Sequence, residues 1–369
     1  MRIGHLRPLY ERGRPPFSTV WLETTHNTPE AGRHIDLRWR AARDRLVEQG
    51  APDDVCAALD AAVGPAELAG HQSQLLVAAD GQVLLDEHLP VRPNPEVART
   101  GPLPHLLPWL VAPRRPPYML VLIDRTGADI TIRTEQDHEV VTVEGDRYPI
   151  EKNAPGGWSQ RRYQQAAEET WQHNSGRVAA EVDRLHRRHP VPVVMVGGDV
   201  RALAALLDKL PEAVRSVVVE LDDVGRAAGV SREALDRRVA GALDRWQQAE
   251  VGDLIAEFEQ ERGQRDRAAE EFAAVAEAAR QGQVDTLLVN GPVLDDLPPV
   301  WIGPAAEQFA GSRDEVAALG VPDPVRERAD AALVRAVAAT DGAVRYVDPA
   351  RLGLKDGVAA LLRYAARPA

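Results

Sequence analysis

Segments of strand character alternate with segments of helical character along much of this chain, which predicts an α/β protein with mixed sheets and flanking helices. A proline-rich cluster at residues 113–117 indicates a domain border. The length of 369 residues is enough for two or three domains. We therefore expect three domains: an N-terminal α+β domain (1–115), a middle α/β domain (116–235) and a C-terminal α/β domain (236–369) that begins with a long helix.

The first third combines strands and helices. Residues 17–25 are rich in β-branched and aromatic types and predict a strand, and a helix is expected from Thr28-Pro29-Glu30 to Gly50, with a short one at 52–62. Asp80-Gly81 is a strong hairpin signal between strands at 74–79 and 82–88. Residues 89–104 hold five prolines and are expected to form a loop, followed by a short apolar stretch at 106–111.

The middle domain is expected to hold most of the alternation. Its predicted strands are 119–124, 129–134, 139–143, 191–196 and 216–221, and its predicted helices are 160–189 and 200–210. Residues 153–159 contain Pro155 and two glycines, so no regular element is expected there.

The last third begins with a helical region over 231–281, either one helix or two joined helices. Ser231 is a suitable N-cap, and Gly241, Gly252 and Gly263 predict a break. A strand at 284–290, a helix at 329–340, a strand at 343–347 and a final helix at 358–364 are expected to complete the domain.

The charge distribution is uneven. The net charge of −12 argues against a dedicated DNA-binding protein, yet 1–50 holds nine arginines against six acidic residues, and 152–190 holds seven basic against four acidic residues. Of the 44 basic residues, 41 are arginine, which suits bidentate phosphate contacts but also follows from GC-rich coding. No apolar run approaches the roughly 20 residues of a membrane span, and no signal core follows Met1. A cytoplasmic protein without membrane partners is expected.

Common catalytic and cofactor motifs are absent. The chain has no P-loop, no Gly-x-Gly-x-x-Gly after a strand, no Gly-x-Ser-x-Gly elbow and no His-Glu-x-x-His. Its single cysteine, Cys56, excludes an internal disulfide. His186 and His189 lack a nearby third ligand, and the acidic pairs Asp222-Asp223 and Asp295-Asp296 suit turns and caps as well as Mg²⁺. No cofactor and no resident metal are therefore expected.

One segment has a composition suited to RNA. It combines a glycine pair, an aromatic residue, hydroxyl and amide donors and two arginines, in the order Gly156, Gly157, Trp158, Ser159, Gln160, Arg161, Arg162 and Tyr163. Glycines bring backbone N–H groups close to a ligand, arginines bind phosphate, and Trp or Tyr rings stack on bases. The segment is a candidate RNA-binding loop; an ordinary flexible loop before a helix is the alternative.

The same segment resembles the middle-domain tip of archaeo-eukaryotic class-I release factors. Those proteins carry Gly-Gly-Gln-Ser, an Arg-aromatic pair and a helix with His-Asn; this chain has Gly156-Gly157-Trp158-Ser159, Arg162-Tyr163 and His173-Asn174. The resemblance extends to the related Pelota proteins and is best from 118 to 369. Ser18-Thr-Val-Trp-Leu and the ending around Tyr364 are similar to a bacterial, actinobacterial branch, which includes Balon-like hibernation factors and peptidyl-tRNA hydrolase-like proteins.

The resemblance implies a three-domain, release-factor-like translation factor that occupies the A site of the 70S ribosome near the peptidyl transferase centre, with elongation factor Tu as delivery partner. In release factors the glutamine helps to place the attacking water. Here Trp158 stands in that place, and Gln160 lies up to about 7 Å further along an extended chain, which argues against efficient peptide release. No stop-codon motif of the Asn-Ile-Lys-Ser type is found in 1–115.

A hibernation or stress factor is therefore the preferred interpretation. The alternative is a peptidyl-tRNA hydrolase for ribosome rescue with Gln160 as its catalytic residue. A third interpretation is a scaffold that uses the acidic region 191–290, which holds nineteen acidic and twelve basic residues.

Overall fold

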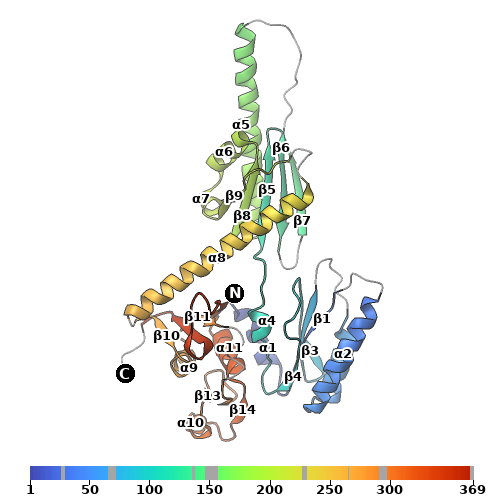
Figure 1. The fold of residues 1–369 in the computed structure, drawn as a ribbon, viewed down its shortest axis with the longest axis vertical. Coiled ribbons are helices and arrows are strands. Elements are labelled where there is room, and N and C mark those ends of the chain that lie inside the picture. The colour runs from blue at the N-terminus through green and yellow to red at the C-terminus, as the bar shows by residue number, and fades with distance from the viewer. Residues whose placement is uncertain are drawn as a thin grey trace. The chain divides into compact units, whose positions relative to one another are not determined.

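The computed structural model describes residues 1–25, 30–64, 72–134, 138–145, 157–226, 231–264, 266–290 and 297–365 (Figure 1). By packing, the chain forms two compact units: residues 1–114 together with 251–369, and residues 115–250. The first border falls inside the proline-rich cluster, and the second falls within helix α8 (Arg232–Gln264). The expected division into three domains remains a prediction. The expected α/β class with mixed sheets is confirmed in both units.

The first unit contains an antiparallel sheet of order β3-β2-β1-β4. Its strands are β1 (Phe17–Glu23), β2 (Ser73–Ala79), β3 (Gln82–Leu89) and β4 (Val97–Gly101). The helices of this part of the chain are α1 (Arg7–Arg12), α2 (Ala31–Glu48), α3 (Asp53–Ala62) and α4 (Leu107–Leu110). The Asp80-Gly81 hairpin is confirmed, since both residues have positive φ and join β2 to β3.

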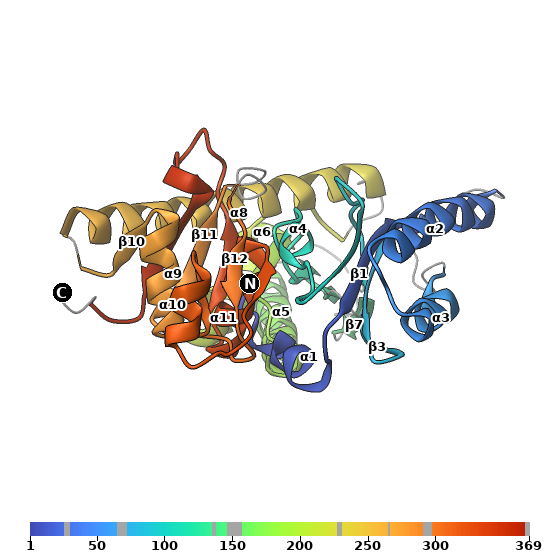
Figure 2. The same cartoon turned by 90° about the horizontal axis from the view of Figure 1, so that it is seen from below.

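Both faces of this sheet are covered, which explains why β1 is buried along nearly its whole length. Val20 and Leu22 pack with α2 and α3, which lie together beside the sheet in Figure 2. Phe17 and Trp21 point the other way, into a core that they share with residues of the C-terminal part, among them Leu333. Segments far apart in the sequence therefore build one hydrophobic core.

The C-terminal part of this unit has a second sheet of order β10-β16-β11-β15 and a small sheet of order β13-β12-β14. The strands are β10 (Ala268–Glu270), β11 (Val284–Val289), β12 (Val300–Ile302), β13 (Phe309–Ala310), β14 (Val325–Glu327), β15 (Ala343–Tyr346) and β16 (Val358–Leu362). The helices are α9 (Phe272–Arg280), α10 (Arg313–Ala318) and α11 (Ala329–Ala339), and the second half of α8 also packs here.

Three sequence predictions are wrong in this unit. The expected final helix at 358–364 is the central strand β16, which pairs with β10 and β11 and is buried on both faces, so its five consecutive apolar residues carry no alternation. The expected loop at 89–104 contains strand β4. The helical region at 231–281 is interrupted by strand β10, whereas α8 runs through Gly241 and Gly252 without a break.

The second unit is one five-stranded mixed sheet of order β7-β6-β5-β8-β9. Its strands are β5 (Tyr118–Asp124), β6 (Gly127–Arg133), β7 (His138–Glu144), β8 (Val193–Gly198) and β9 (Val218–Glu220). Its helices are α5 (Gly157–Arg188), α6 (Val200–Lys209), α7 (Glu212–Arg215) and the first half of α8. β7, β6 and β5 are antiparallel, and β8 and β9 continue from β5 in parallel.

Alternation along β5 directs its side chains to both faces. Met119 and Val121 belong to a core with α5 and α6, whereas Tyr118 and Leu120 pack with Val239 and its neighbours on α8. Helices therefore cover both faces of this sheet, as the expected α/β pattern requires. None of the helices in the described ranges is both long and apolar enough to cross a lipid bilayer.

Candidate functional site

The segment with RNA-binding composition lies at the start of helix α5. The helix begins at Gly157, so Trp158, Ser159 and Gln160 are in its first turn, and Arg161, Arg162 and Tyr163 follow directly. The expectation of an irregular backbone is therefore wrong for residues 157–159. Glycine weakens a helix by about 1 kcal/mol but does not forbid one, and good helix formers follow. Gly156 and residues 153–155 lie outside the described residues.

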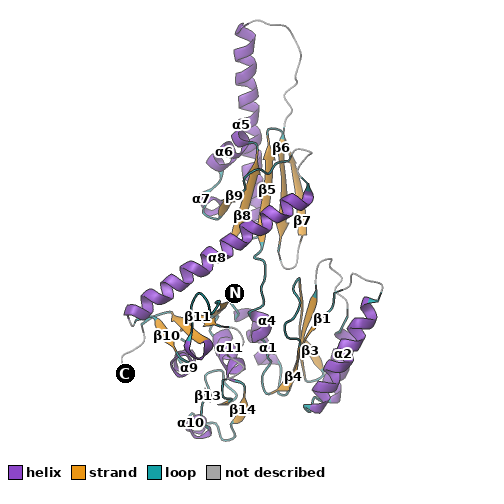
Figure 3. Ribbon diagram, in the orientation of Figure 1, coloured by secondary structure: helices purple, strands orange, loops and turns teal. Residues whose placement is uncertain are grey.

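Much of α5 extends beyond its packed part, as Figures 1 and 3 show. Asn174 and Ser175 are the first buried residues that the structure describes on this helix, and Val178, Val182 and Leu185 continue the buried face. Asn174 lies seventeen positions after Gly157, which corresponds to about 25 Å of helix at 1.5 Å per residue. The start of α5 therefore lies at the end of a helical arm, which is defined as residues 157–173.

The backbone at the start of the arm is electropositive. The first four N–H groups of an α-helix have no partner within the helix, and the helix dipole adds about half a positive charge there. The first turn of α5 holds no acidic residue that would neutralise this charge. Two arginines, Arg161 and Arg162, follow this first turn in the sequence. The arm can therefore bind an anion such as an RNA phosphate.

The packed part of α5 is held in place by Asn174. Its side chain is 2 % exposed, and its Nδ2 donates to the carbonyl oxygen of Arg125 over 3.0 Å. A side chain at Gly145 would collide with Asn174, because a Cβ atom there would lie 2.3 Å from the Asn174 Cγ. Asn174 therefore joins helix α5 to the β5–β6 turn and to Gly145, which follows β7.

Arg125 adds a second set of contacts at the same place. Its guanidinium lies over the ring of Trp171, 4.5 Å from the centroid, and its Nε donates to Asp199 over 3.2 Å. Asp199 also caps α6 by accepting from the backbone N–H of Arg201. Gly198 has φ +146°, and a Cβ there would lie 1.8 Å from the carbonyl oxygen of Ile123, so this position requires glycine. The glycine lets the end of β8 bring Asp199 beside Arg125.

A neighbouring ion-pair group holds the other end of the same turn. Arg226 donates to Asp129 over 3.0 Å and lies 3.5 Å from Asp124. The hydrogen bond to Asp129 raises the pKa of the Arg226 guanidinium. These contacts orient the β5–β6 turn, whose Arg125 carbonyl accepts the hydrogen bond from Asn174.

The candidate metal-binding residues that the structure describes make separate contacts. His186 contacts the carbonyl oxygen of Val191 at 3.2 Å, and His189 lies 3.3 Å from Glu139. His173, which belongs to the His-Asn motif, is exposed. Asp223 lies 3.4 Å from Arg238, and Asp295-Asp296 lies outside the described residues. Across the described parts of the chain, no group of three or more His, Cys, Asp or Glu side chains is placed to hold a metal ion.

The sequence offers Gly156–Tyr163 as a candidate RNA-binding loop, which stays a prediction, and His173-Asn174 as part of the family motif; Arg125 and Asp199 were not singled out. Asp199 carries a readable signal, since an aspartate after two glycines and before an apolar helical segment is a typical N-cap. The partner Arg125 carries none, because only the fold brings residues 125 and 199 together.

Comparison with known proteins places this geometry in a family. The sequence model of "Bacterial archaeo-eukaryotic release factor family 2" matches residues 117–264. Two relatives from Mycobacterium tuberculosis, Uncharacterized protein Rv2629 (strain H37Rv) and Uncharacterized protein MT2704 (strain CDC 1551), are each 33 % identical over 370 residues, covering 99 % of this chain and 98 % of the relative.

Several solved structures are similar to this chain at low sequence identity. The crystal structure of Archaeoglobus fulgidus Pelota is 18 % identical, covers 80 % of each chain and gives a TM-score of 0.34. Dom34 of S. cerevisiae is 11 % identical, with a TM-score of 0.37 over 68 % of this chain and 64 % of that one. A ribosome-bound archaeal Pelota with ABCE1 is 16 % identical, with a TM-score of 0.38 over 99 % of this chain and 95 % of that one.

The family match spans the sheet of the second unit and the arm, and the two mycobacterial relatives align over almost the whole chain. Both findings agree with the resemblance predicted from the tip of the arm and from His173-Asn174, which is thereby confirmed. The chain belongs to bacterial archaeo-eukaryotic release factor family 2, a family of release-factor-like translation factors.

Proposed function

We propose that this chain is a cytoplasmic ribosome-binding factor that places the start of α5 in the A site, near the peptidyl transferase centre, and acts in hibernation or stress. The observation that carries the proposal is the start of α5: its first turn has no acidic residue, Arg161 and Arg162 follow, and about 25 Å of helix separates it from Asn174, the first buried residue that the structure describes on α5. Orphan backbone N–H groups, the helix dipole and two arginines together favour the phosphates of RNA.

We do not expect this chain to release peptides efficiently. Trp158 stands where release factors carry their glutamine, and Gln160 lies two residues further along the chain, up to about 7 Å away if extended. A misplacement of about 1 Å costs on the order of 100-fold in rate. Trp158 offers one N–H donor and a ring that stacks on a base, and it lacks the amide groups of glutamine. Elongation factor Tu is the proposed delivery partner, as the family resemblance implies.

Ribosome pelleting tests the binding. Arg161→Ala/Arg162→Ala should weaken binding to 70S ribosomes and lower the slope of log K against log salt by about 1 to 2, since each lost phosphate contact lowers it by about 0.7 to 0.9. The matched control is Arg184→Ala/Arg187→Ala on the same helix. These arginines already pair with Glu181 and Asp183 at 2.6 Å, so the control should bind like wild type. Equal binding by all three proteins would refute the proposed contact.

A single-turnover assay separates occupancy from hydrolysis. Trp158→Ala should weaken binding about 5- to 150-fold, because base–aromatic stacking is worth about 1–3 kcal/mol. Release of the peptide from peptidyl-tRNA should stay at the background rate in wild type and in Gln160→Ala. Clear wild-type cleavage that Gln160→Ala abolishes would instead establish the alternative, a peptidyl-tRNA hydrolase. Competition with aminoacyl-tRNA delivered by elongation factor Tu tests the A site directly.

A further inference from the structure

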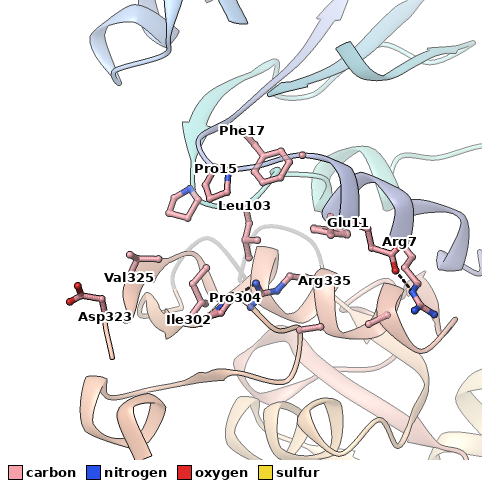
Figure 4. A pocket seen from close by; sticks show the side chains of 16 residues that line it. Arg7, Glu11, Pro15, Phe17, Leu103, Ile302, Pro304, Asp323, Val325 and Arg335 are labelled. Carbon is pink, nitrogen blue, oxygen red and sulfur yellow. Dashed lines mark hydrogen bonds and ion pairs between the residues drawn. The ribbon is translucent and has the colours of Figure 1, made fainter. Parts of the chain in front are cut away.

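A cavity of about 590 Å³ lies within the first unit, away from the arm, and is shown in Figure 4. It is lined by α1 and the following segment, by residues 102 and 103, and by the C-terminal part of the unit. Phe17, Leu103 and Ile302 give it an apolar wall. Its volume falls within the range of about 300–1,000 Å³ that is typical of small-molecule sites.

Arg335 is the one charged side chain of the lining that is more than nine-tenths buried in the described structure; it is 6 % exposed. Its Nη1 donates to the carbonyl oxygen of Gly303 over 3.0 Å. Its Nε and Nη2 have no hydrogen-bond partner among the described residues. The hydroxyl group of Tyr10, which also lines the cavity, is buried and likewise unpartnered in that part of the chain.

The two carboxylates that act electrostatically on Arg335 make no hydrogen bond or ion pair with it among the described contacts. Glu327 pairs with Arg99 and accepts from the backbone N–H of Leu103 at 2.8 Å. Glu307 attracts the charge of Arg335 through space but is exposed and makes no hydrogen bond with it among the described contacts. Burying a cation without a partner costs several kcal/mol, so an unpaired arginine beside a cavity indicates that an anion completes the site.

The Nε and Nη2 groups of Arg335, which have no partner among the described residues, determine which anion fits the cavity. Nε–H and Nη2–H point in the same direction and form the planar fork that binds the two oxygens of a carboxylate. Burial raises the pKa of Tyr10, so its hydroxyl keeps its proton and serves as a third donor.

The remaining charges of the lining are balanced in pairs. Arg7 pairs with Glu11 at 2.7 Å, and Asp323 lies 3.4 Å from Arg313. Among the described residues, Arg335 is then the one charged group of the lining without an ion-pair partner, which suits a monoanion better than a polyanion. We propose that this cavity binds a small organic carboxylate with an apolar body, its carboxylate on the fork of Arg335 and its body against Phe17, Leu103 and Ile302.

Isothermal titration calorimetry on the full chain tests the proposal, with octanoate and 4-phenylbutanoate as probes. Both should bind saturably, and octanamide, which has a similar shape without the charge, should bind at least tenfold more weakly. Arg335→Met should weaken octanoate binding at least tenfold, and Tyr10→Phe about two- to tenfold. Arg280→Met is the matched control: Arg280 also donates to a carbonyl oxygen, that of Phe309, but lies outside the cavity, so this variant should bind like wild type.

Several results would overturn the assignment. Absence of saturable binding by both carboxylates would do so, as would equal binding of octanoate and octanamide to wild type. Tighter binding of octyl phosphate than of octanoate would show that the anion is a phosphate. The octanamide comparison uses wild type alone, so it decides the question even if Arg335→Met does not fold.

Discussion

Glu327 joins the two halves of the first unit, and its removal should be costly. Its side chain is fully buried, whereas Arg99, its partner, is 24 % exposed. Glu327 also accepts from the backbone N–H groups of Leu103 at 2.8 Å and of Arg328 at 2.7 Å. Glu327→Ala therefore leaves one mostly buried cation and one buried N–H group without their acceptor.

Breaking a buried ion pair by removing one partner costs about 3–5 kcal/mol, and we expect the lower end because Arg99 is partly solvated. In a unit of this size each kcal/mol corresponds to about 2–4 °C of Tm, so Glu327→Ala should lower the Tm of the first unit by roughly 6–12 °C. Differential scanning calorimetry measures this shift. The control is Glu277→Ala, which removes an exposed pair with Arg280 and should cost less than about 1 kcal/mol.

The double variant Arg99→Met/Glu327→Leu tests the cause. It removes both charges and keeps the volume, so it should recover a large part of the lost stability. If Glu327→Ala costs less than about 1 kcal/mol, or if the double variant is as unstable as the single one, the pair does not hold the two segments together.

Three further predictions concern stability. Asn174→Ala should lower the unfolding free energy of the second unit by about 1–3 kcal/mol, because the Arg125 carbonyl loses its buried donor; calorimetry with no loss would contradict this role. Ser231→Ala removes the N-cap of α8 and should cost about 0.5–2 kcal/mol in the same assay. Burial alone would raise the pKa of Asp330, but hydrogen bonding to His105 and an arginine outweighs it, so the pKa is lowered. Its stabilising effect is therefore present above about pH 4 and is lost as the pH falls through the lowered pKa, so the Tm difference between wild type and Asp330→Asn should shrink below about pH 4.

The sequence predicted elements well where one face is solvated or where a turn residue marks an end. The Asp80-Gly81 hairpin and the Ser231 cap are local signals, and both are present in the structure. The predicted helix at 358–364 was wrong, because a strand buried on both faces, such as β16, has no hydrophobic period that distinguishes it from a buried helix. Strand β4 was not predicted, because the prolines on both sides of it indicate a loop.

The candidate site was partly predictable for the same reason. The tip of the arm is a continuous motif, whereas Arg125 and Asp199 meet only through the fold. Arg335 was missed although it carried a signal: the segment 329–339 is almost wholly apolar, and a helix that is apolar all round is buried. A charged residue within such a segment must be buried with it and therefore needs a partner.

The first unit is made from two segments that the ribosome synthesises far apart in time. Residues 1–114 carry one half of its core, and the other half arrives only with residues 251–369. At about 5–20 residues per second, translation of the intervening and final 255 residues takes roughly 10–50 s. During that interval apolar side chains such as Leu106 and Trp109 lack the surface that covers them in the finished fold. Residues 115–250 form a continuous unit and can complete their sheet first, so the nascent chain is expected to hold a finished middle and an open N-terminal sheet, a state in which chaperone contact is most useful.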